Sequence, residues 1–353
     1  MSAPAPPAVE SHGIEVRLAG QERSEEWDRF VRLEPGACGY HSWPWVRIVR
    51  EAAGLEVYPL MALREGEIVG ILPLARQRLW PLKAQLLSLP FVNYAGLLCA
   101  DEEAENALLE AALRLAQERG AARIELRHTS PRASAWGRRV DRVRFVLDLP
   151  AKTEDLWRSL PGERRTQVRR AQKNGLVPQT GDADLLQDFY GIISRTWRDH
   201  GSPVLPRRFF AAVMGYHPSD TRICVVRSGD RVVAAGFLYR FGERVEVPWV
   251  GSLPEFSSSQ PGVLLYWTML QQGCEWGARV FDFGRSPKGS GTAVFKKRWG
   301  GVEEQLFWSV WPATSAEGGT SPLATSLVKN LWKRLPVGLA TSLGARLSPN
   351  IPL

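Results

Sequence analysis

The sequence predicts a mixed α/β (α+β) protein in which one arrangement of strands and helices occurs twice. An apolar hairpin pattern occurs at residues 57–79 and again at residues 222–250. Each hairpin is followed by an amphipathic helix pattern and then by another apolar strand. At 353 residues the chain is also long enough for two domains, each with a core of its own.

The first copy begins with two apolar strands around a Glu-Gly turn, "VYPLMALREGEIVGILPLARQRL". A strand-like piece "NYAGLLC" (93–99), a helix in "ENALLEAALRLAQERGA" (105–121) and a closing strand "ARIELR" (122–127) follow. The second copy has a Ser-Gly-Asp turn, the strand-like piece "VPWVGS" (247–252), a helix in "PGVLLYWTMLQQGCEWGA" (261–278) and the closing strand "ARVFDFGR" (278–285). Both helices end in a Gly-Ala step, which is common at helix C-termini.

This order of hairpin, bridging strand, helix and strand is that of the GNAT acyltransferase fold. Two copies therefore predict a tandem pair of GNAT-like domains with a boundary near Pro150. We expect a disordered N-terminus (1–13), a first domain (14–150), a second domain (151–312) and a linker with an amphipathic tail (313–353). The alternative is two unrelated α/β units that share common strand and helix patterns.

The composition favours a folded protein with anionic partners. Apolar residues make up 44% of the chain and charged residues 23%, as in ordinary folded domains. The net charge of +8 favours phosphates, nucleic acid or an acidic membrane face, without choosing among them. The cysteines at 38, 99, 224 and 274 form neither a CxxC pair nor a metal-ligand cluster, so we expect reduced thiols, no metal site and a cytoplasmic location. The N-terminus also lacks the basic start and apolar core of a signal peptide.

The second copy ends in "FDFGRSPKGSGTAVFKKRWG" (281–300), which adds an acid, a glycine loop and a lysine pair that the first copy lacks. Together with "YHSWPW" (40–45), "LPGERRTQVRRAQKNGL" (160–176) and "GSLPEFSSSQPGVLLY" (251–266), this motif resembles the FemAB family. More narrowly, it is similar to the FemAB-related proteins associated with exosortase/PEP-CTERM systems of exopolysaccharide-producing bacteria. The resemblance implies two GNAT-like domains that transfer an acyl group to an amine. In characterised relatives the donor is aminoacyl-tRNA and the acceptor a peptidoglycan precursor, and a Phe-Lys pair, here Phe295 and Lys296, lies at the donor site.

Two departures from the family pattern leave the donor open between aminoacyl-tRNA and acyl-CoA. No long heptad segment interrupts the second domain, so the helical arm of some tRNA-using relatives is missing. The Arg/Gln-x-x-Gly-x-Gly loop of acetyl-CoA-dependent GNAT enzymes is missing too, because "SSSQPGVLLY" (257–266) has a single glycine. We expect either donor to bind as a substrate, with no cofactor held tightly.

Lys296 and Asp282 are the candidate catalytic residues. Amide formation passes through a tetrahedral oxyanion, and one fixed donor or cation lowers such a barrier by about 3 kcal/mol. Lys296 follows a strand-like "GTAVF", so only one of Lys296 and Lys297 would point into a cleft. Asp282, between two phenylalanines, would serve as an acid, a base or a group that orients the amine. The structural alternatives are a surface lysine and an internal salt bridge from Asp282 to Arg285 or Lys288.

The residues around Lys296 are candidate donor ligands. An arginine fork suits a phosphate or carboxylate, and glycines let a loop backbone approach a ligand closely. The donor-binding set is Phe295, Lys297, Arg285, Gly289 and Gly291.

The basic residues of "GERRTQVRRAQKNG" (162–175) predict a surface for an anionic acceptor. They spread around a predicted helix with almost no interleaved aromatic residues, which disfavours stacking on single-stranded nucleic acid. The phosphates would belong to a lipid-diphosphate-linked acceptor or to tRNA, and the alternative is a solvated charged face. The acceptor-binding set is Arg164, Arg165, Arg169, Arg170 and His41.

The composition changes after Trp311. Residues 312–322, "PATSAEGGTSP", are typical of a linker. Residues 323–347 then place apolar residues at helical spacing among basic ones, with Pro336 dividing two short helices. The tail is either an interfacial segment in peripheral contact with the inner membrane or a helix that packs back on the domain.

The predicted function is that of a FemAB-like N-acyltransferase that modifies a cell-envelope or exopolysaccharide precursor. The enzyme would be cytoplasmic, with the tail at the cytoplasmic face of the inner membrane. The alternative is a non-catalytic pair of degenerate GNAT domains that binds an anionic glycan, lipid or RNA in an export or polysaccharide-assembly system. The oligomeric state is left open.

Overall fold

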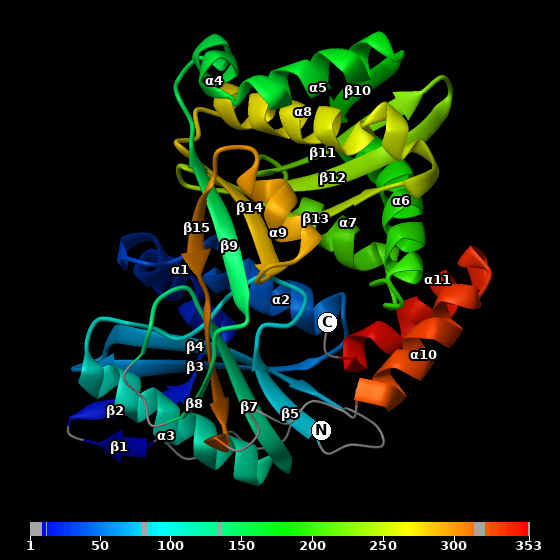
Figure 1. Ribbon diagram of the computed structural model, residues 1–353. Helices are drawn as coiled ribbons and strands as arrows, with labels where there is room; N and C mark the ends of the chain where they lie inside the picture. Colours follow the sequence, from blue (N-terminus) through cyan, green and yellow to red (C-terminus); the bar gives the residue numbers. More distant parts are fainter. Residues whose placement is uncertain (1–8, 12, 79–83, 133–135, 314–321, 352–353) are drawn as a thin grey trace. The chain divides into compact units, whose positions relative to one another are not determined.

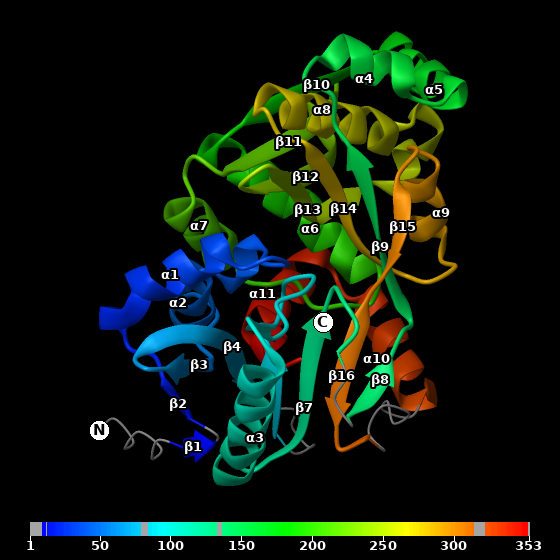
Figure 2. The ribbon, with the colours of Figure 1, turned by 90° about the vertical axis from the view of Figure 1, so that its left-hand side faces the viewer.

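A computed structural model describes residues 9–11, 13–78, 84–132, 136–313 and 322–351. The chain divides into two compact units. Unit 1 comprises residues 1–140, 306–320 and 348–353, and unit 2 comprises residues 141–305 and 321–347. Each unit has its own sheet and its own core (Figures 1 and 2).

The sheet of unit 1 runs in the order β1-β2-β3-β4-β5-β7-β16-β8, with β6 paired to β4. Its strands are β1 (Val9–Ser11), β2 (Ile14–Leu18), β3 (Glu56–Arg64), β4 (Glu67–Gln77), β5 (Ala84–Ser88), β6 (Leu98–Cys99), β7 (Ala121–His128), β8 (Gly137–Arg139) and β16 (Phe307–Trp311). Its helices are α1 (Ser24–Leu33), α2 (Trp43–Glu51) and α3 (Glu102–Glu118). Asp101 caps α3 by accepting a hydrogen bond from the backbone N–H of Ala104. Helix α3 covers one face of the sheet, and α1 and α2 also pack on it (Figure 2).

The sheet of unit 2 runs in the order β10-β11-β12-β13-β14-β9-β15. Its strands are β9 (Arg142–Asp148), β10 (Leu176–Gly181), β11 (Thr221–Ser228), β12 (Arg231–Phe241), β13 (Arg244–Ser252), β14 (Val280–Pro287) and β15 (Val302–Gln305). Its helices are α4 (Thr153–Ser159), α5 (Gly162–Lys173), α6 (Leu186–Asp199), α7 (Arg207–Tyr216), α8 (Pro261–Glu275), α9 (Gly291–Lys297), α10 (Pro322–Arg334) and α11 (Val337–Leu347).

Helices α8 and α6 pack on opposite faces of the unit 2 sheet (Figure 1). Successive side chains of a strand point to opposite faces. Accordingly, a Cβ on Gly236 would meet Met269 of α8, whereas the adjacent Phe237 contacts Phe189 of α6. In both sheets the pairing is antiparallel except for one central parallel pair, β5 with β7 and β13 with β14.

The repeated fold predicted from the sequence is confirmed, and the strand that bridges hairpin and helix in the first copy was misplaced. Only Leu98–Cys99 of the piece at 93–99 is a strand. The counterpart of β13 is β5, because each pairs with the hairpin on one side and in parallel with the strand after the helix on the other. All five residues of β5 are buried, so its sequence has no polar alternation to indicate a strand.

The units do not follow the predicted boundaries 14–150 and 151–312. Strand β9 pairs with β14, so residues 141–150 belong to unit 2. Strand β16 pairs with β7, so residues 306–312 belong to unit 1. Most of the predicted disordered N-terminus (1–13) lies outside the described residues, and residues 9–11 form β1.

The tail consists of the two helices that Pro336 was expected to separate, α10 and α11. Both contact α6 of unit 2. The expectation of a helix that packs back on the domain is therefore met.

Candidate functional site

Strand β14 carries an irregularity at the motif that the sequence singled out. Its pairing with β9 shifts register between Asp282 and Arg285, and Gly284 adopts a left-handed backbone conformation with φ of 72°. Such a conformation suits glycine, since it has no Cβ. Before the bulge, Phe281 and Phe283 are fully buried in the core that α8 forms with the sheet. The bulge directs the carbonyls of Gly284 and Arg285 towards helix α9.

The segment before Lys296 is a helix, and the predicted strand is wrong. Ser290 caps α9 by accepting a hydrogen bond from the N–H of Ala293 at 3.2 Å, and the helix runs from Gly291 to Lys297. Consecutive residues of a helix lie about 100° apart around its axis, so neighbouring lysines do not alternate as in a strand. Lys296 is 7% exposed, whereas Lys297 is exposed to solvent.

The Lys296 ammonium group is held against the bulge. Its Nζ donates to the carbonyl oxygens of Gly284 and Arg285, both at 2.9 Å. An ammonium group has three protons, and these two acceptors take two of them. Burial lowers the pKa of Lys296 to about 8, although Asp282 and Glu246 act in the opposite direction. The cation is therefore fixed in place and close to its titration point at neutral pH.

Asp282 is fully buried, and the structure shows ion pairs between it and residues of two other strands. Its Oδ2 lies 3.4 Å from Nη1 of both Arg144 on β9 and Arg244 on β13. Its Oδ1 accepts a hydrogen bond from the backbone N–H of Gly284 at 2.9 Å. Asp282 thus forms internal salt bridges, as the structural alternative expected. Their partners are Arg144 and Arg244, which the sequence did not indicate. Arg144 and Arg244 lie 138 and 38 residues away along the chain, so no local pattern reveals them.

Aromatic rings and one buried arginine fix α9 in position. Phe295 packs on Tyr266 of α8 and on Trp299, with ring centroids 5.2 and 6.4 Å apart. The Arg164 guanidinium lies over the rings of Phe295 and Trp299, 4.9 and 5.3 Å from their centroids. It also donates to the carbonyls of Phe295 and Arg298 at the C-terminal end of α9.

Arg164 therefore does not belong to the basic surface on which it was placed by prediction. It is 2% exposed, and burial lowers its pKa. The other members of the set, Arg165, Arg169 and Arg170, also lie on α5, and the last two are exposed. Arg169 lies over the ring of Trp157, 5.4 Å from its centroid.

The predicted donor-binding residues lie on β14, on α9 and in the loop between them. Arg285 is half-buried, and Lys297, Gly289 and Gly291 are exposed. Gly289 has φ of 73°, and a Cβ at either glycine would meet nothing within 4 Å. The backbone of this loop is therefore open to a ligand.

Strands β13 and β14 separate near the same place. They pair in parallel over only three positions, from Arg244–Val280 to Glu246–Asp282. Beyond Glu246, β13 continues to Ser252 without pairing to β14. Backbone groups along this edge can pair with an extended ligand that carries amides.

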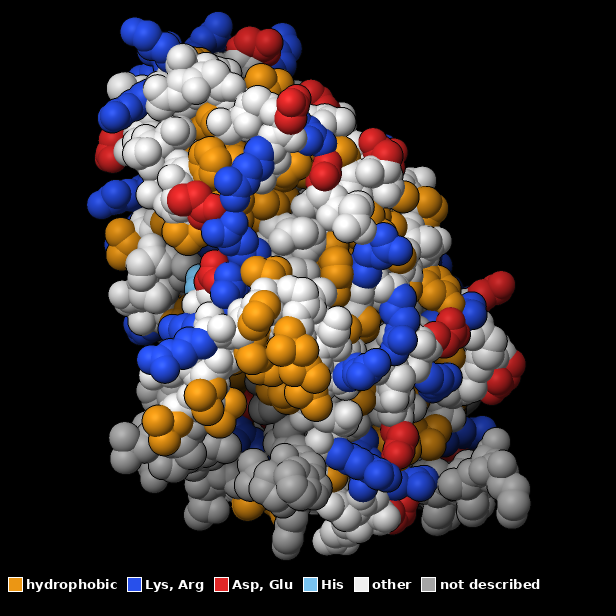
Figure 3. Space-filling model, turned by 90° about the vertical axis from the view of Figure 1, so that its right-hand side faces the viewer, with side chains coloured by type: hydrophobic (Ala, Val, Ile, Leu, Met, Phe, Trp, Pro, Cys, Tyr) orange, Lys and Arg blue, Asp and Glu red, His pale blue; other side chains and the backbone are white. Residues whose placement is uncertain are grey.

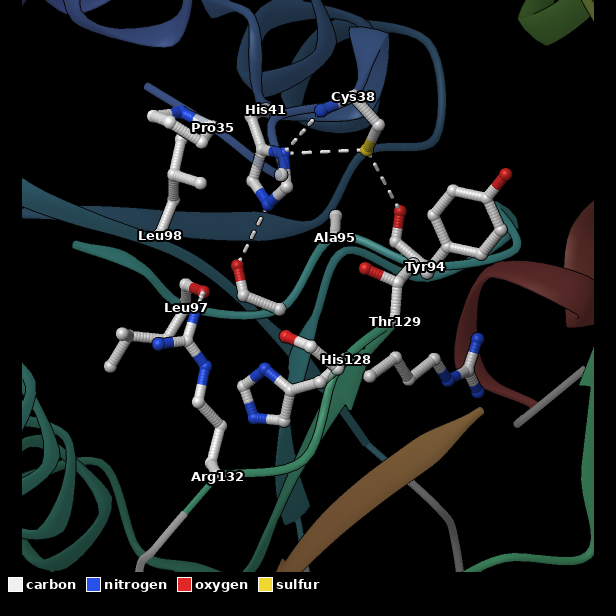
Figure 4. Close-up of a pocket in the computed structure, with 14 residues that line it drawn as sticks. Pro35, Cys38, His41, Tyr94, Ala95, Leu97, Leu98, His128, Thr129 and Arg132 are labelled. Carbon is white, nitrogen blue, oxygen red and sulfur yellow. Dashed lines mark hydrogen bonds between the residues drawn. The ribbon is translucent and has the colours of Figure 1, made fainter. Parts of the chain in front are cut away.

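His41 belongs to unit 1, where it lines a polar pocket (Figure 4). The pocket has a volume of about 50 Å³, which is room for one or two water molecules. Its lining includes Cys38, His128 and Arg132. His41 Nε2 lies 2.9 Å from the carbonyl oxygen of Gly96, while Nδ1 lies 3.1 Å from the backbone N–H of Cys38.

These contacts fix a neutral His41 and do not favour a role in binding phosphate. Nε2 must donate to a carbonyl and Nδ1 must accept from an N–H, so one proton satisfies both sites. Burial lowers the pKa of His41 to about 4 and that of His128 to about 3. The pocket around His41 was missed because Cys38, Gly96 and His128 come from three distant segments.

Within the described ranges, no group of three or more His, Cys, Asp or Glu could hold a metal ion. None of the helices in the described part of the chain has the length and apolar character of a membrane span. The four cysteines are buried and form no disulfide.

Comparison with known proteins identifies the same architecture. Residues 162–297 match the family model of the acetyltransferase (GNAT) domain. No curated protein sequence matches the chain. The crystal structure of FemX is similar, with a TM-score of 0.62 and 17% identity over 81% of this chain and 95% of FemX.

Two further solved structures are similar over most of their length. One is the C-terminal domain of a putative lysylphosphatidylglycerol synthetase from Agrobacterium fabrum (TM-score 0.53, 15% identity, 88% of this chain and 96% of that one). The other is a tandem GNAT protein from the clavulanic acid biosynthesis pathway (TM-score 0.54, 11% identity, 87% of this chain and 100% of that one). At these identities the likeness establishes the fold, which is a FemAB-like tandem of GNAT domains.

Proposed function

We propose that the chain is an N-acyltransferase whose reaction centre lies at the β14 bulge of unit 2. The observation that carries this proposal is the buried Lys296 ammonium group, held by two carbonyls with one proton left to donate. A cation fixed in a buried site stabilises a developing oxyanion without reorganising first. Lys296 would donate a hydrogen bond to the acyl carbonyl oxygen as the acceptor amine attacks, and the negative charge would form beside it. The tetrahedral intermediate would then collapse to the amide by breaking the donor's ester or thioester bond, and the released hydroxyl or thiol would take up the proton that the amine gives up.

In this proposal the other residues of the motif position the substrates. Phe295 and Arg285 would contact the donor, with the glycine loop and Lys297 around it. Asp282 would act through the arginines it holds and through the field at Lys296, because its own oxygens are occupied by Arg144, Arg244 and Gly284. We assign proton transfer to the substrates themselves, or to solvent, more readily than to Asp282.

The donor is proposed to be an aminoacyl-tRNA or an acyl-CoA. The GNAT match of residues 162–297 supports an acyl donor in general, and the likeness to FemX supports the aminoacyl form. The divergence of β13 from β14 would bind an extended amide-bearing arm, and the exposed arginines of α5 would bind phosphates. Both features suit either donor.

The acceptor is proposed to be an amine on a cell-envelope or exopolysaccharide precursor, at the cytoplasmic face of the membrane. A neighbour named for lysylphosphatidylglycerol synthesis has this fold, which supports an acceptor carried by a lipid. The resemblance of residues 281–300 supports a place beside exosortase/PEP-CTERM systems.

The test is ligand capture by the chain purified from its own host with mild washing. Native mass spectrometry should detect a bound acyl-CoA or aminoacyl-tRNA, and the detected donor should then be turned over in the presence of envelope precursors. Lys296→Met should retain the donor and lose turnover by 100-fold or more, on the order of an oxyanion donor's contribution. Lys297→Met is the matched control, since its side chain is exposed on the same helix. A Lys296→Met protein that binds and reacts like the wild type would reject the proposal and favour a pair of domains that only binds.

A further inference from the structure

The tail helices are unusual because several of their large apolar side chains are exposed to solvent. Among the residues whose side chains the structure describes, ten large apolar side chains are exposed. Five of these ten belong to the tail: Leu327, Val328, Leu331, Leu339 and Leu347. Exposed leucines are ordinary when isolated, but a cluster on one short segment marks an interaction surface.

Helix α10 packs on the rest of unit 2 through the side that carries Lys329. The Cβ, Cα and carbonyl oxygen of Lys329 lie within 2.8 to 3.1 Å of where a Cβ on Gly201 would be. Arg198 of α6 donates to the carbonyls of Lys333 and Leu335 at 3.2 and 3.1 Å. These contacts are made by Lys329, Lys333 and Leu335, so the stripe of exposed apolar side chains on α10 takes no part in them.

The stripe follows from helical geometry. At 100° per residue, Leu327, Val328 and Leu331 fall within an arc of about 100°, and Lys329 lies outside it. Their side chains are 66%, 63% and 66% exposed. An amphipathic helix of a globular protein normally buries this stripe in its own core, and α10 does the reverse.

Helix α11 anchors the tail on unit 2 and adds exposed apolar side chains to those of α10. Gly344 is buried, and a Cβ there would lie 2.9 Å from the backbone nitrogen of Val204, so α11 is docked directly on the segment after α6. Leu339 is 48% exposed. Figure 3 shows hydrophobic side chains gathered over this part of unit 2, with basic side chains around them.

The charges decide among the partners that could cover the stripe. Residues 322–351 contain Lys329, Lys333, Arg334 and Arg346 and no Asp or Glu. A second copy docked face to face would bring these like charges together. An apolar stripe on helices whose charged residues are all cations matches the acyl and headgroup region of an anionic bilayer.

We propose that α10 and α11 form a docking surface for an anionic lipid bilayer, with Leu327, Val328 and Leu331 inserted among the lipids. The basic residues contact the phosphates, while the rest of unit 2 remains outside the bilayer. This inference is independent of which donor and acceptor the reaction centre uses.

Vesicle sedimentation of the full chain tests the proposal. The wild type should bind vesicles of phosphatidylcholine and phosphatidylglycerol mixed three to one, and should bind pure phosphatidylcholine weakly. Leu327→Ser with Leu331→Ser should lower the partition coefficient about tenfold for each leucine. Lys333→Gln with Arg334→Gln should lower it about fivefold for each charge and weaken its dependence on salt.

The matched control is Leu33→Ser, because Leu33 is 77% exposed on α1 and lies outside the tail. This variant should bind vesicles like the wild type. The proposal is overturned if the wild type does not bind the anionic vesicles, or if the Leu327→Ser, Leu331→Ser variant binds them equally well. It is also overturned if sedimentation equilibrium shows a dimer that this double variant dissociates, since a second copy would then cover the stripe.

A second measurement does not depend on removing apolar side chains. The four native cysteines are buried, so Leu331→Cys provides one accessible thiol for an environment-sensitive dye. The emission of the dye should shift to the blue when anionic vesicles are added. An unchanged spectrum at full vesicle binding would show that the stripe stays in water, and would also reject the proposal.

Discussion

Units 1 and 2 share a strand order and a helix after the hairpin, but the strands that end each copy carry different chemistry. In unit 1, Glu125 of β7 pairs with Arg123, Arg127 and Arg139 at 2.8 to 3.3 Å. The pocket beyond β7 contains His41 and His128, both held neutral by burial. In this part of unit 1 the arginines that line the pocket, Arg127 and Arg132, are thus paired with the carboxylates of Glu125 and Glu105.

In unit 2, the corresponding strand β14 is followed by a helix whose lysine cation, Lys296, is held against the strand. Asp282 is paired with two arginines, and the Gly284 bulge then provides the two carbonyls that hold Lys296. The difference between the units depends on a bulge and a seven-residue helix, since the topology around them is the same. A fold alone does not define a reaction centre, and a few residues after one strand do.

The largest expected effect concerns the cation at the β14 bulge. In an acyl-transfer assay, Lys296→Met should lower kcat 100- to 1,000-fold, whereas Lys297→Met should change mainly KM and by less than about tenfold. Because Lys296 must be protonated to donate, and its pKa is about 8, the wild-type rate should decline above that pH. Rates from pH 6 to 10 check this. A decline that persists unchanged in a residually active Lys296→Met enzyme would have another origin.

A second comparison concerns the buried carboxylates of the two units. Asp282→Ala should lower the free energy of unfolding by about 3 kcal/mol, because it removes the buried carboxylate that pairs with both Arg144 and Arg244. Glu125→Ala should cost a similar amount, since three arginines lose theirs. Of the two variants, only Asp282→Ala should also have a lower turnover rate per molecule of folded protein. Denaturant unfolding with activity measured on the same samples distinguishes these outcomes, and equal activity loss in both variants would contradict the assignment.

Local patterns in the sequence predicted most of the repeated fold. The hairpins, α3, α8 and the strands after them follow from apolar periodicity and turn residues, because those signals are local. Strand β5 was missed because a fully buried strand has no alternation. Helix α9 was interpreted as a strand although Ser290 and Gly300 stand where a helix cap and a terminating glycine belong.

The candidate site was predicted less completely than the fold, because its partners come from distant parts of the chain. Lys296 and Asp282 were recognisable from the motif, and both are buried side chains at β14. Their surroundings depend on β9 and β13, which provide Arg144 and Arg244. Arg164 looked like one more basic residue of α5, and only the packing of α9 shows that it lies among aromatic rings.

A third comparison concerns the loss of folding stability at acidic pH. His41 and His128 have pKa values of about 4 and 3, below their value in an unfolded chain, so the unfolded state binds more protons as the pH falls below 6.5. Stability is then lost on acidification, by about 2 kcal/mol for each histidine at pH 5. His128→Asn should therefore lose about 2 kcal/mol less than the wild type between pH 7 and pH 5. His200→Asn, at an exposed position of unit 2, is the control and should lose as much as the wild type, as measured by denaturant unfolding at both pH values.

The smallest effects separate the two kinds of arginine on α5. Arg164→Met should lower the free energy of unfolding by about 1 to 2 kcal/mol, because it removes hydrogen bonds to the end of α9 and contacts with two rings. Arg169→Gln with Arg170→Gln should leave stability nearly unchanged, since both side chains are exposed.

If α5 binds phosphates, the Arg169→Gln, Arg170→Gln variant should instead bind tRNA more weakly, and its logarithmic salt dependence should be shallower by about two. Filter binding at several salt concentrations measures this slope. An unchanged slope would mean that these arginines are a solvated face, and the donor would then have to be held by the β14 loop alone. A loss of stability in this variant as large as that of Arg164→Met would show that the basic surface is structural throughout, and α5 would no longer be a candidate phosphate site.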